Sequence, residues 1–281
     1  MPELPEVETV ASFLKQHLPG KKITAAAWLS GKKLRVNPNP LDWPLIIDQP
    51  IMAVERRGKN LLVVMANELR LFSHLGMSGH WLLLDKSHHY QASAHDHYAL
   101  TLDSGQQLMY HDPRRFGGLN ILSAAAAADF TQKLGLEPFD KKLQASWLFP
   151  LLQRFKKPIK NLLLQQELIA GIGNIYACEA LFMAAIHPEK PANTVSLSEC
   201  AKLIEALQFV LEKAIQAGGS SLKDYRGADG QPGYFQHQFM VYGRKNQPCG
   251  TCNGCGEQVQ HIEQSGRSSW YCPFRQRLTT D

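Results

Sequence analysis

The chain has 281 residues, 44% of them hydrophobic, so it is long and apolar enough to form more than one buried core. Its 30 lysines and arginines against 25 acidic residues give a formal charge of +5, which permits an acidic partner without requiring one. No run approaches the roughly 20 consecutive apolar residues of a membrane span, and the acidic amino end lacks the layout of a signal peptide. We therefore expect a soluble, cytoplasmic protein with no membrane partner.

The first 133 residues predict one helix followed by β-strands. Prolines and acidic residues in the opening turn favour a helix over about residues 3–18. Turn-forming residues such as Asp103-Ser104-Gly105 then separate short apolar runs of strand length. These runs are LLVVMA, LRLFSHLGM, HWLLLD, HYALTLD, QQLMYHD and GGLNIL. The pattern is typical of a β-sandwich or barrel, and we place this domain at 1–133.

Residues 134–240 predict a helical domain. The clearest helix is SLSECAKLIEALQFVLEKAIQAGG, which has a capping box at Ser196 and Glu199 and a Gly218-Gly219 stop. Shorter helices are expected around 145–155, 159–169 and 174–184, and the alanine run at 124–128 predicts a helix or linker. The glycine-rich segment 218–235 is too long for a tight turn, so we expect a functional loop there.

The tail, 241–281, concentrates the cysteines. Cys252 and Cys255, followed after sixteen residues by Cys272, have zinc-ribbon spacing, and so short a segment is hard to stabilise without metal. The last cysteine of a standard ribbon is replaced by Arg275. Cys249 is the first candidate to replace it.

Two other interpretations of the cysteines stay open from the residues alone. His261 is the second candidate for the fourth ligand, and a metal-free hairpin held by packing is the alternative to a metal site. Cys178 and Cys200 lie in helical patterns, where we expect them to be small buried hydrophobes.

A possible anion site lies at GIGNIY, residues 171–176. The glycines allow a tight connection between two helices, and Asn174 is expected to cap the second helix, whose free N–H groups attract a phosphate. Lys160, with Lys156 and Lys157, would add positive charge on the same side. A lysine cluster can also be only a solvated face.

HLGMSG (74–79) and DPRRFG (112–117) place large side chains between glycines and turn residues. An enzyme that reaches a base inside duplex DNA must evict that base and fill the gap, using apolar wedges and a polar group for the stranded partner. Met77, Arg114 and Phe116 have this chemistry. Alternatively, Met77 and Phe116 are ordinary core residues at strand ends.

Taken in order, several motifs closely resemble the bacterial formamidopyrimidine-DNA glycosylases over essentially the whole chain. They are PELPEVET, RRGKNLL, SHLGMSG, DPRRFG, LGLEPF, GIGNIYACEALF, AIHP, DGQPGYFQ, VYGRK and the cysteine tail. The resemblance implies an α+β multidomain fold, with an N-terminal β-sandwich, a helix-two-turns-helix domain and a C-terminal β-hairpin zinc finger. It also implies a monomer that acts on double-stranded DNA containing oxidised purines or abasic sites.

The implied activity is that of a glycosylase and abasic-site lyase for 8-oxoguanine and formamidopyrimidines. Pro2, exposed by removal of Met1, matches the family's nucleophile, which attacks the sugar C1′ and cuts the strand by β,δ-elimination. Glu3 matches the general acid/base, Glu6 a supporting carboxylate, and Lys59 the lysine that binds phosphate near the lesion.

The resemblance also assigns DNA contacts and a lesion loop. His74, Asn174 and Arg267 match residues that grip the DNA backbone. The wedge residues are those named above, and Ser220, Ser221 and Tyr225 belong to the flap that folds over 8-oxoguanine. One structural zinc ion is expected per chain, held by Cys249, Cys252, Cys255 and Cys272.

The sequence leaves two alternatives to this function. An endonuclease VIII-like glycosylase for oxidised pyrimidines also starts Pro-Glu, but Leu4 and DPRRFG favour the purine branch. A non-catalytic damaged-DNA-binding protein would keep the fold without the chemistry, and the joint presence of Pro2, Glu3, Glu6 and Lys59 opposes that reading.

Overall fold

A computed structural model describes residues 1–85, 90–221, 225–250, 252 and 255–278. The chain forms two compact units. The first contains Met1–Lys133 and Ile215–Gln236, and the second contains Leu134–Ala214 and His237–Asp281. The segment 215–236, which includes the predicted loop 218–235, therefore belongs to the first unit and not to the helical domain predicted at 134–240.

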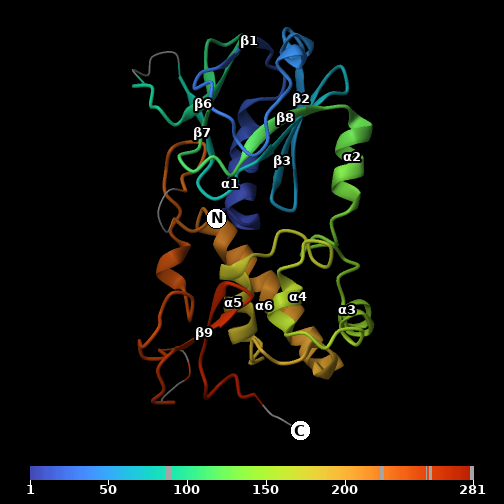
Figure 1. Ribbon diagram of the computed structural model, residues 1–281, viewed down its shortest axis with the longest axis vertical. Helices are drawn as coiled ribbons and strands as arrows, with labels where there is room; N and C mark the ends of the chain where they lie inside the picture. The colour runs from blue at the N-terminus through green and yellow to red at the C-terminus, as the bar shows by residue number, and fades with distance from the viewer. Residues whose placement is uncertain (86–89, 222–224, 251, 253–254, 279–281) are drawn as a thin grey trace. The chain divides into compact units, whose positions relative to one another are not determined.

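The first unit is a β-sandwich of two four-stranded antiparallel sheets, accompanied by helix α1 (Leu4–His17) (Figure 1). One sheet has the order β1-β6-β7-β5 and the other β2-β3-β4-β8. The strands are β1 (Ile23–Trp28), β2 (Ile51–Arg57), β3 (Asn60–Met65), β4 (Arg70–His74), β5 (His80–Leu84), β6 (Asp96–Leu102), β7 (Gln107–His111) and β8 (Gly118–Leu122). The β-sandwich prediction is confirmed.

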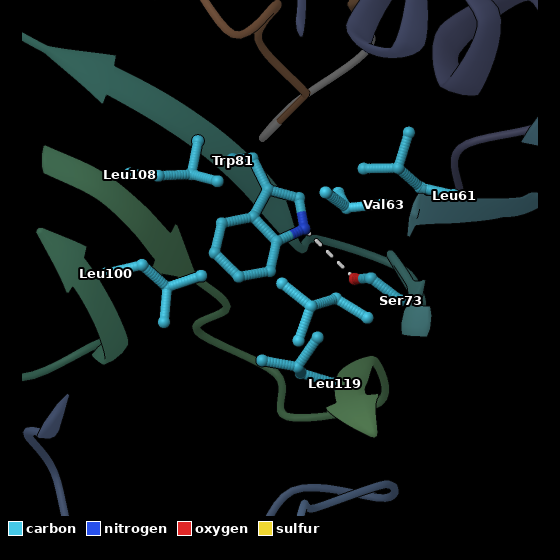
Figure 2. Close-up of a pocket in the computed structure, with 8 residues that line it drawn as sticks. Leu61, Val63, Ser73, Trp81, Leu100, Leu108 and Leu119 are labelled. Carbon is cyan, nitrogen blue, oxygen red and sulfur yellow. Dashed lines mark hydrogen bonds between the residues drawn. The ribbon is translucent and has the colours of Figure 1, made fainter. Parts of the chain in front are cut away.

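Alternating apolar side chains from the two sheets meet in one core (Figure 2). Leu61 and Leu119 come from one sheet, and Leu100 and Trp81 come from the other. A buried indole needs a partner for its N–H, and Trp81 Nε1 donates to Ser73 Oγ at 3.0 Å. Helix α1 buries its own apolar stripe in the same core, which fixes the amino end of the chain to the sandwich.

Strands β1 and β2 were not predicted, and their sequences explain why. β1 reads ITAAAW, in which three consecutive alanines carry little strand preference. β2 carries exposed and charged side chains, and its burial does not alternate regularly. The alanine run forms helix α2 (Ala124–Gln132), because Ser123 Oγ caps it by accepting from Ala126 N at 3.2 Å.

The second unit is mainly helical. Its helices are α3 (Ala145–Leu152), α4 (Ile159–Leu163), α5 (Asn174–Met183) and most of α6 (Leu197–Gln216). The capping box before α6 is present, with Ser196 N donating to Glu199 Oε2 at 2.8 Å and Glu199 N donating to Ser196 Oγ at 3.1 Å. Short 3-10 turns in the chain are η1 (Pro40–Ile46), η2 (Ala192–Thr194) and η3 (Phe235–Gln238).

Helix α4 is shorter than the predicted span of 159–169. The side chain of Gln166 accepts from Gly171 N at 2.9 Å and donates to Ile172 O at 2.8 Å. These bonds hold a turn before GIGNIY instead of a continued helix. A side chain that satisfies nearby backbone groups in this way competes with helix formation.

The tail folds as the predicted hairpin, β9 (Gln260–Gln264) and β10 (Arg267–Tyr271). It packs against α5 through a cluster that includes Phe182, Val241 and Val259. Cys178 belongs to this cluster, and Cys200 is equally buried, so both are small buried hydrophobes as predicted. Within the described parts of the chain, no helix is long and apolar enough to cross a membrane.

Candidate functional site

The amino end is built around two buried carboxyl groups. Pro2 and Glu3 precede α1, and Glu6 lies in its first turn. Glu3 N donates to Glu6 Oε2 at 2.8 Å, and the exposed fractions of Glu3 and Glu6 are only 2% and 1%. The PELPE sequence therefore does more than start a helix, because it places two carboxyl groups next to Pro2, out of bulk water.

Glu6 also binds the predicted lesion loop. Its Oε1 atom accepts from Ser220 N at 2.7 Å, and its carbonyl accepts from Tyr225 Oη at 3.0 Å. Gly219, at φ +82°, brings the loop so close that a Cβ atom there would lie 3.0 Å from Glu6 Cγ. These contacts explain why segment 215–236 belongs to the first unit.

A serine side chain links two parts of the loop to each other. Ser221 Oγ donates to Tyr225 O at 2.8 Å and accepts from Gly233 N at 2.8 Å. Burial raises the pKa of Tyr225, so its hydroxyl remains a protonated donor toward Glu6. Residues 222–224, in the first half of the predicted loop, lie outside the described residues.

Lys59 stands on the turn between β2 and β3. Arg57 pairs with Asn60 in the hairpin, so Gly58 and Lys59 form its two-residue connection. Arg56 forms an ion pair with Glu8 of α1 and donates to Gly58 O at 3.0 Å. The turn that carries Lys59 is therefore tied to the helix that starts beside Pro2.

His74, at the end of β4, is a neutral donor. Its Nδ1 atom accepts from Gly76 N at 2.9 Å, which leaves the proton of a neutral ring on Nε2. Burial, together with the positive charges of Lys59 and Arg35, lowers the pKa of His74 to about 4. At neutral pH the ring can donate a hydrogen bond from Nε2 without carrying charge.

We expect the His74 imidazole to titrate near pH 4 and to hold the Nε2–H tautomer above that pH. Because the folded-state pKa lies below the ordinary 6.5, the unfolded chain binds the proton more readily between these values. The stabilisation is thus complete above pH 6.5 and is lost as the pH falls toward 4. Nitrogen-15 NMR of the imidazoles, with His74 assigned through a His74→Gln variant, measures this. Titration near 6.5 would contradict the assignment.

The two predicted wedge loops lie in the first unit, between β4 and β5 and between β7 and β8. Met77 is 37% exposed and Phe116 is 46% exposed, so neither is an ordinary core residue. The Arg114 guanidinium lies 5.2 Å from the centre of the Phe116 ring. Phe116 and His74 also line one hollow of about 500 Å³ with Arg35.

In the second unit, Lys160 and Asn174 do not stand as predicted. Lys160 is wholly buried, and its Nζ atom donates to Ser268 O at 2.9 Å and to Ser269 Oγ at 2.6 Å. Asn174 is the first residue of α5 and not its cap, which is Gly173. Its Nδ2 atom also donates to Ser268 O, at 2.9 Å.

These bonds change the interpretation of Lys160. A buried ammonium group cannot reach a phosphate on the surface, so the expectation that Lys160 contacts DNA is corrected to a supporting role. Lys160 and Asn174 hold the strand immediately after Arg267, which itself is exposed at the start of β10. Arg267 also lines a hollow of about 410 Å³ with Lys157 and Asn161.

Four cysteines gather in the tail. One sulfur atom from each of Cys249, Cys252, Cys255 and Cys272 lies within 4.8 Å of the others, and Cys252 Sγ is 3.8 Å from Cys272 Sγ. Four thiolates at this separation fit a tetrahedral site for a thiophilic metal ion such as zinc. His261, the second candidate ligand, instead packs on Trp270 at 5.6 Å between ring centres, and it is outside the cluster.

Arg275, which replaces the expected cysteine, joins the tail to α5. It donates from Nε to Phe182 O and from a terminal nitrogen to Met183 O, each at 2.8 Å, and lies 5.2 Å from the centre of the Phe182 ring. The last carbonyls of a helix lack partners within the helix and attract positive charge. Arg275 therefore caps α5 instead of binding metal.

Arg275→Ala should lower the free energy of unfolding by about 1–2 kcal/mol, because two helix carbonyls lose a charged donor. Metal content should stay unchanged, since the four sulfur atoms are untouched. Urea unfolding and elemental analysis measure the two quantities. Arg277→Ala is the matched control, because Arg277 contacts only its neighbour Phe274 among the interactions that the described residues show. Equal stability of the two variants would refute the cap.

Glu179 was missed by the sequence analysis. It is buried in α5, and its carboxyl oxygens accept from Met240 N, Val241 N and Tyr242 N at 2.7–3.0 Å. Burial raises its pKa, and the three backbone donors oppose that shift. A lone acidic residue in the apolar helix NIYACEALFM was the available sign of such a role.

Comparison with known proteins agrees with this arrangement. Residues 1–119 match the family model of the formamidopyrimidine-DNA glycosylase N-terminal domain, and residues 134–226 match that of the formamidopyrimidine-DNA glycosylase H2TH domain. The chain belongs to the formamidopyrimidine-DNA glycosylase family. The family is one of DNA-repair enzymes, and the fold of this chain is its fold: β-sandwich, helical domain and a terminal hairpin with a cysteine cluster.

Individual relatives match along nearly the whole chain. The formamidopyrimidine-DNA glycosylase of Cereibacter sphaeroides is 41% identical over 99% of this chain and 100% of its own length. That of Rickettsia africae is 42% identical over 97% of this chain and 98% of its own length. Among solved structures, the Thermus thermophilus protein is 37% identical with a TM-score of 0.85, covering 98% of both chains. The Lactococcus lactis protein in complex with abasic-site DNA is 33% identical with a TM-score of 0.88, covering 98% of this chain and 100% of that one.

Proposed function

We propose that this chain is a glycosylase and abasic-site lyase that removes oxidised purines, 8-oxoguanine and formamidopyrimidines, from double-stranded DNA. The observation that carries the proposal is the bridge formed by Glu6. Its carboxyl oxygens bind Glu3 N on one side and Ser220 N on the other, so one side chain holds the amino end and the root of the lesion loop together. A reacting amine and a loop that covers the base need this proximity.

The proposed nucleophile is the amine of Pro2 after Met1 has been removed. The amine attacks the sugar C1′ as the bond from C1′ to the damaged base breaks, and the base leaves with the bonding electrons and takes up a proton. The attacking nitrogen gives up its N–H proton, and the bond from C1′ to the ring oxygen breaks as that oxygen takes up a proton. The product is an iminium ion whose nitrogen carries no hydrogen, so its positive charge cannot be relieved by loss of a proton from nitrogen. This electron sink permits loss of the 3′ phosphate by β-elimination and of the 5′ phosphate by δ-elimination.

Glu3 is proposed to move the protons. Opening of the ring requires a proton on the ring oxygen, and Glu3 is the carboxyl group adjacent to Pro2 in the chain. Glu6 supports it by holding Glu3 N at 2.8 Å. The positive charge of Lys59 would bind the lesion's phosphate and disfavour protonation of the Pro2 amine.

DNA binding is proposed to divide between the two units. In the first, His74 would donate from Nε2 to a backbone phosphate, and Met77, Arg114 and Phe116 would fill the space left by the flipped nucleotide. In the second, Arg267 and the N-terminus of α5 at Asn174 would bind phosphates. We propose that the chain acts as a monomer.

The tail is proposed to hold one zinc ion through its four cysteines. The ion would supply structure and no reaction chemistry, because a four-thiolate site leaves no open position for a substrate. Its contribution would be to order the tail that carries Arg267, in which Lys160 and Asn174 already bind the carbonyl of the next residue, Ser268.

Borohydride trapping on lesion-containing duplexes tests the function. An active lyase must give a covalent protein–DNA adduct with an 8-oxoguanine duplex, accompanied by release of the oxidised base. Preferential trapping on a thymine-glycol duplex would favour the endonuclease VIII-like alternative. Tight binding of damaged DNA with no adduct would support the non-catalytic alternative and refute the proposal.

A further inference from the structure

The two wedge loops, 74–79 and 112–117, are joined by a buried carboxyl group. Asp112 and Ser78 are both 0% exposed, and Ser78 Oγ donates to Asp112 Oδ1 at 2.6 Å. Gly117 N donates to Asp112 Oδ2 at 2.9 Å. Arg114 N lies 3.2 Å from Asp112 Oδ1 and 3.1 Å from Ser78 Oγ. Each of these groups lies within three residues of a wedge side chain.

The backbones of the two loops also touch. A Cβ atom on Gly76 would lie 2.2 Å from Gly117 N, so only glycine permits this approach. Tyr110 Oη donates to His74 O at 3.3 Å from the strand that leads into the second loop. Arg115 holds a left-handed conformation, at φ +60°, which costs energy in a residue other than glycine. Such a conformation persists only where its surroundings fix it.

We propose that Asp112 and Ser78 are positioning residues that hold the two wedge loops as one unit, so that Met77, Arg114 and Phe116 enter the DNA together. The proposal deepens the function proposed above and rests on it. We call Asp112 and Ser78 the clamp. The wedge side chains are exposed while the clamp residues are buried, which is the arrangement required of a rigid support. As positioning residues, Asp112 and Ser78 act through the wedge side chains and not on the reacting atoms.

The clamp should matter most when the enzyme must open a paired duplex. Filling the gap left by a flipped nucleotide offsets the cost of unstacking it, and a disordered wedge would enter less often. A lesion that already lies in an unpaired bubble costs little free energy to flip out, so its excision depends less on the wedge. A loosened clamp should therefore slow excision from a paired site selectively, whereas general loss of structure should slow both.

Two substitutions test the clamp. Ser78→Ala removes the hydroxyl that links one loop to the other. Asp112→Asn keeps the shape of the side chain, but its NH2 group replaces one of the two acceptor oxygens. That NH2 group then meets either Arg114 N or Gly117 N, so two hydrogen-bond donors face each other. We expect each to slow single-turnover excision of 8-oxoguanine from a paired duplex by at least about tenfold, and from a three-nucleotide bubble by less than about threefold. The fluorescence of a 2-aminopurine placed next to an uncleavable abasic analogue should change more slowly in both variants, because the wedge enters the DNA more slowly.

Ser73→Ala is the matched control. It also removes a buried hydroxyl from the first unit, but this hydroxyl binds Trp81 Nε1 and Gly118 O within the sheets. Its ratio of paired to bubble rates should equal that of the unchanged protein. Because Met77→Ala acts on the same step, combining it with Ser78→Ala should slow paired excision by less than the product of the two single effects.

Three outcomes would refute the proposed clamp. They are equal slowing on paired and bubble substrates, a ratio of paired to bubble rates in the clamp variants that matches the ratio in Ser73→Ala, and slowing by the double variant of Met77→Ala with Ser78→Ala equal to the product of the single effects. If Asp112→Asn does not fold, Ser78→Ala alone decides. Failure of the proposed function is distinguishable, because then the unchanged protein would neither excise 8-oxoguanine nor trap on it. If the unchanged protein is active and Met77→Ala alone shows the selective loss, only the clamp is refuted.

Discussion

Replacing Pro2 with glycine is expected to lower borohydride trapping on an 8-oxoguanine duplex by at least about tenfold, because the glycine amine is a poorer electron sink. An imine formed from a primary amine can lose its proton and become neutral, whereas the proline iminium stays charged. Glycine also frees the backbone at the point where Pro2 lies buried before α1. Single-turnover excision and gel detection of the adduct measure the two steps separately.

Pro5→Gly is the matched control for this prediction. It makes the same change three residues later, inside α1, and should destabilise the helix without removing the nucleophile. Trapping by Pro5→Gly, corrected for the folded fraction, should remain close to that of the unchanged chain. Mass spectrometry of the active protein should find Met1 absent. Full strand cleavage by protein that retains Met1 would rule out Pro2 as the attacking group.

The sequence predicted the elements whose pattern is local. The helix from Leu197 to Gln216 was predicted because its capping box and apolar stripe lie within one segment. β1 was not predicted, because its alanines form a strand only by pairing with β6, some 75 residues later in the chain. A strand that is stabilised by a distant partner need not show a strand pattern in its own sequence.

The candidate site shows the same division. The resemblance supplied Pro2, Glu3 and Glu6 as a set, but the bond from Glu6 to Ser220 N joins residues 214 positions apart and required the structure. Lys160 is expected from the sequence to add charge near the anion site with Lys156 and Lys157, but the acceptors that its ammonium group binds belong to β10, more than 100 residues away.

Cys249→Ser should lose the zinc ion proposed above, about one per chain in the unchanged protein, and with it the order of the tail. Cys249 is the ligand proposed to take the place of the usual last cysteine, and its sulfur lies within 4.8 Å of the other three. A neutral serine hydroxyl is a much weaker ligand for zinc than a thiolate, and metal binding is coupled to folding in segments this small. Elemental analysis and proteolysis of the tail measure the two effects.

Cys200→Ser is the matched control, because Cys200 is buried in α6 and is not a member of the cluster. It should keep its zinc even if its stability falls. DNA binding by Cys249→Ser should weaken without loss of the reaction proposed for Pro2, since Arg267 belongs to the same tail as the cysteines, while Glu3 and Glu6 belong to the first unit. Trapping at saturating DNA should therefore recover. Unchanged zinc in Cys249→Ser would refute the four-cysteine site, and zinc lost equally from Cys200→Ser would show that the metal reports only on folding.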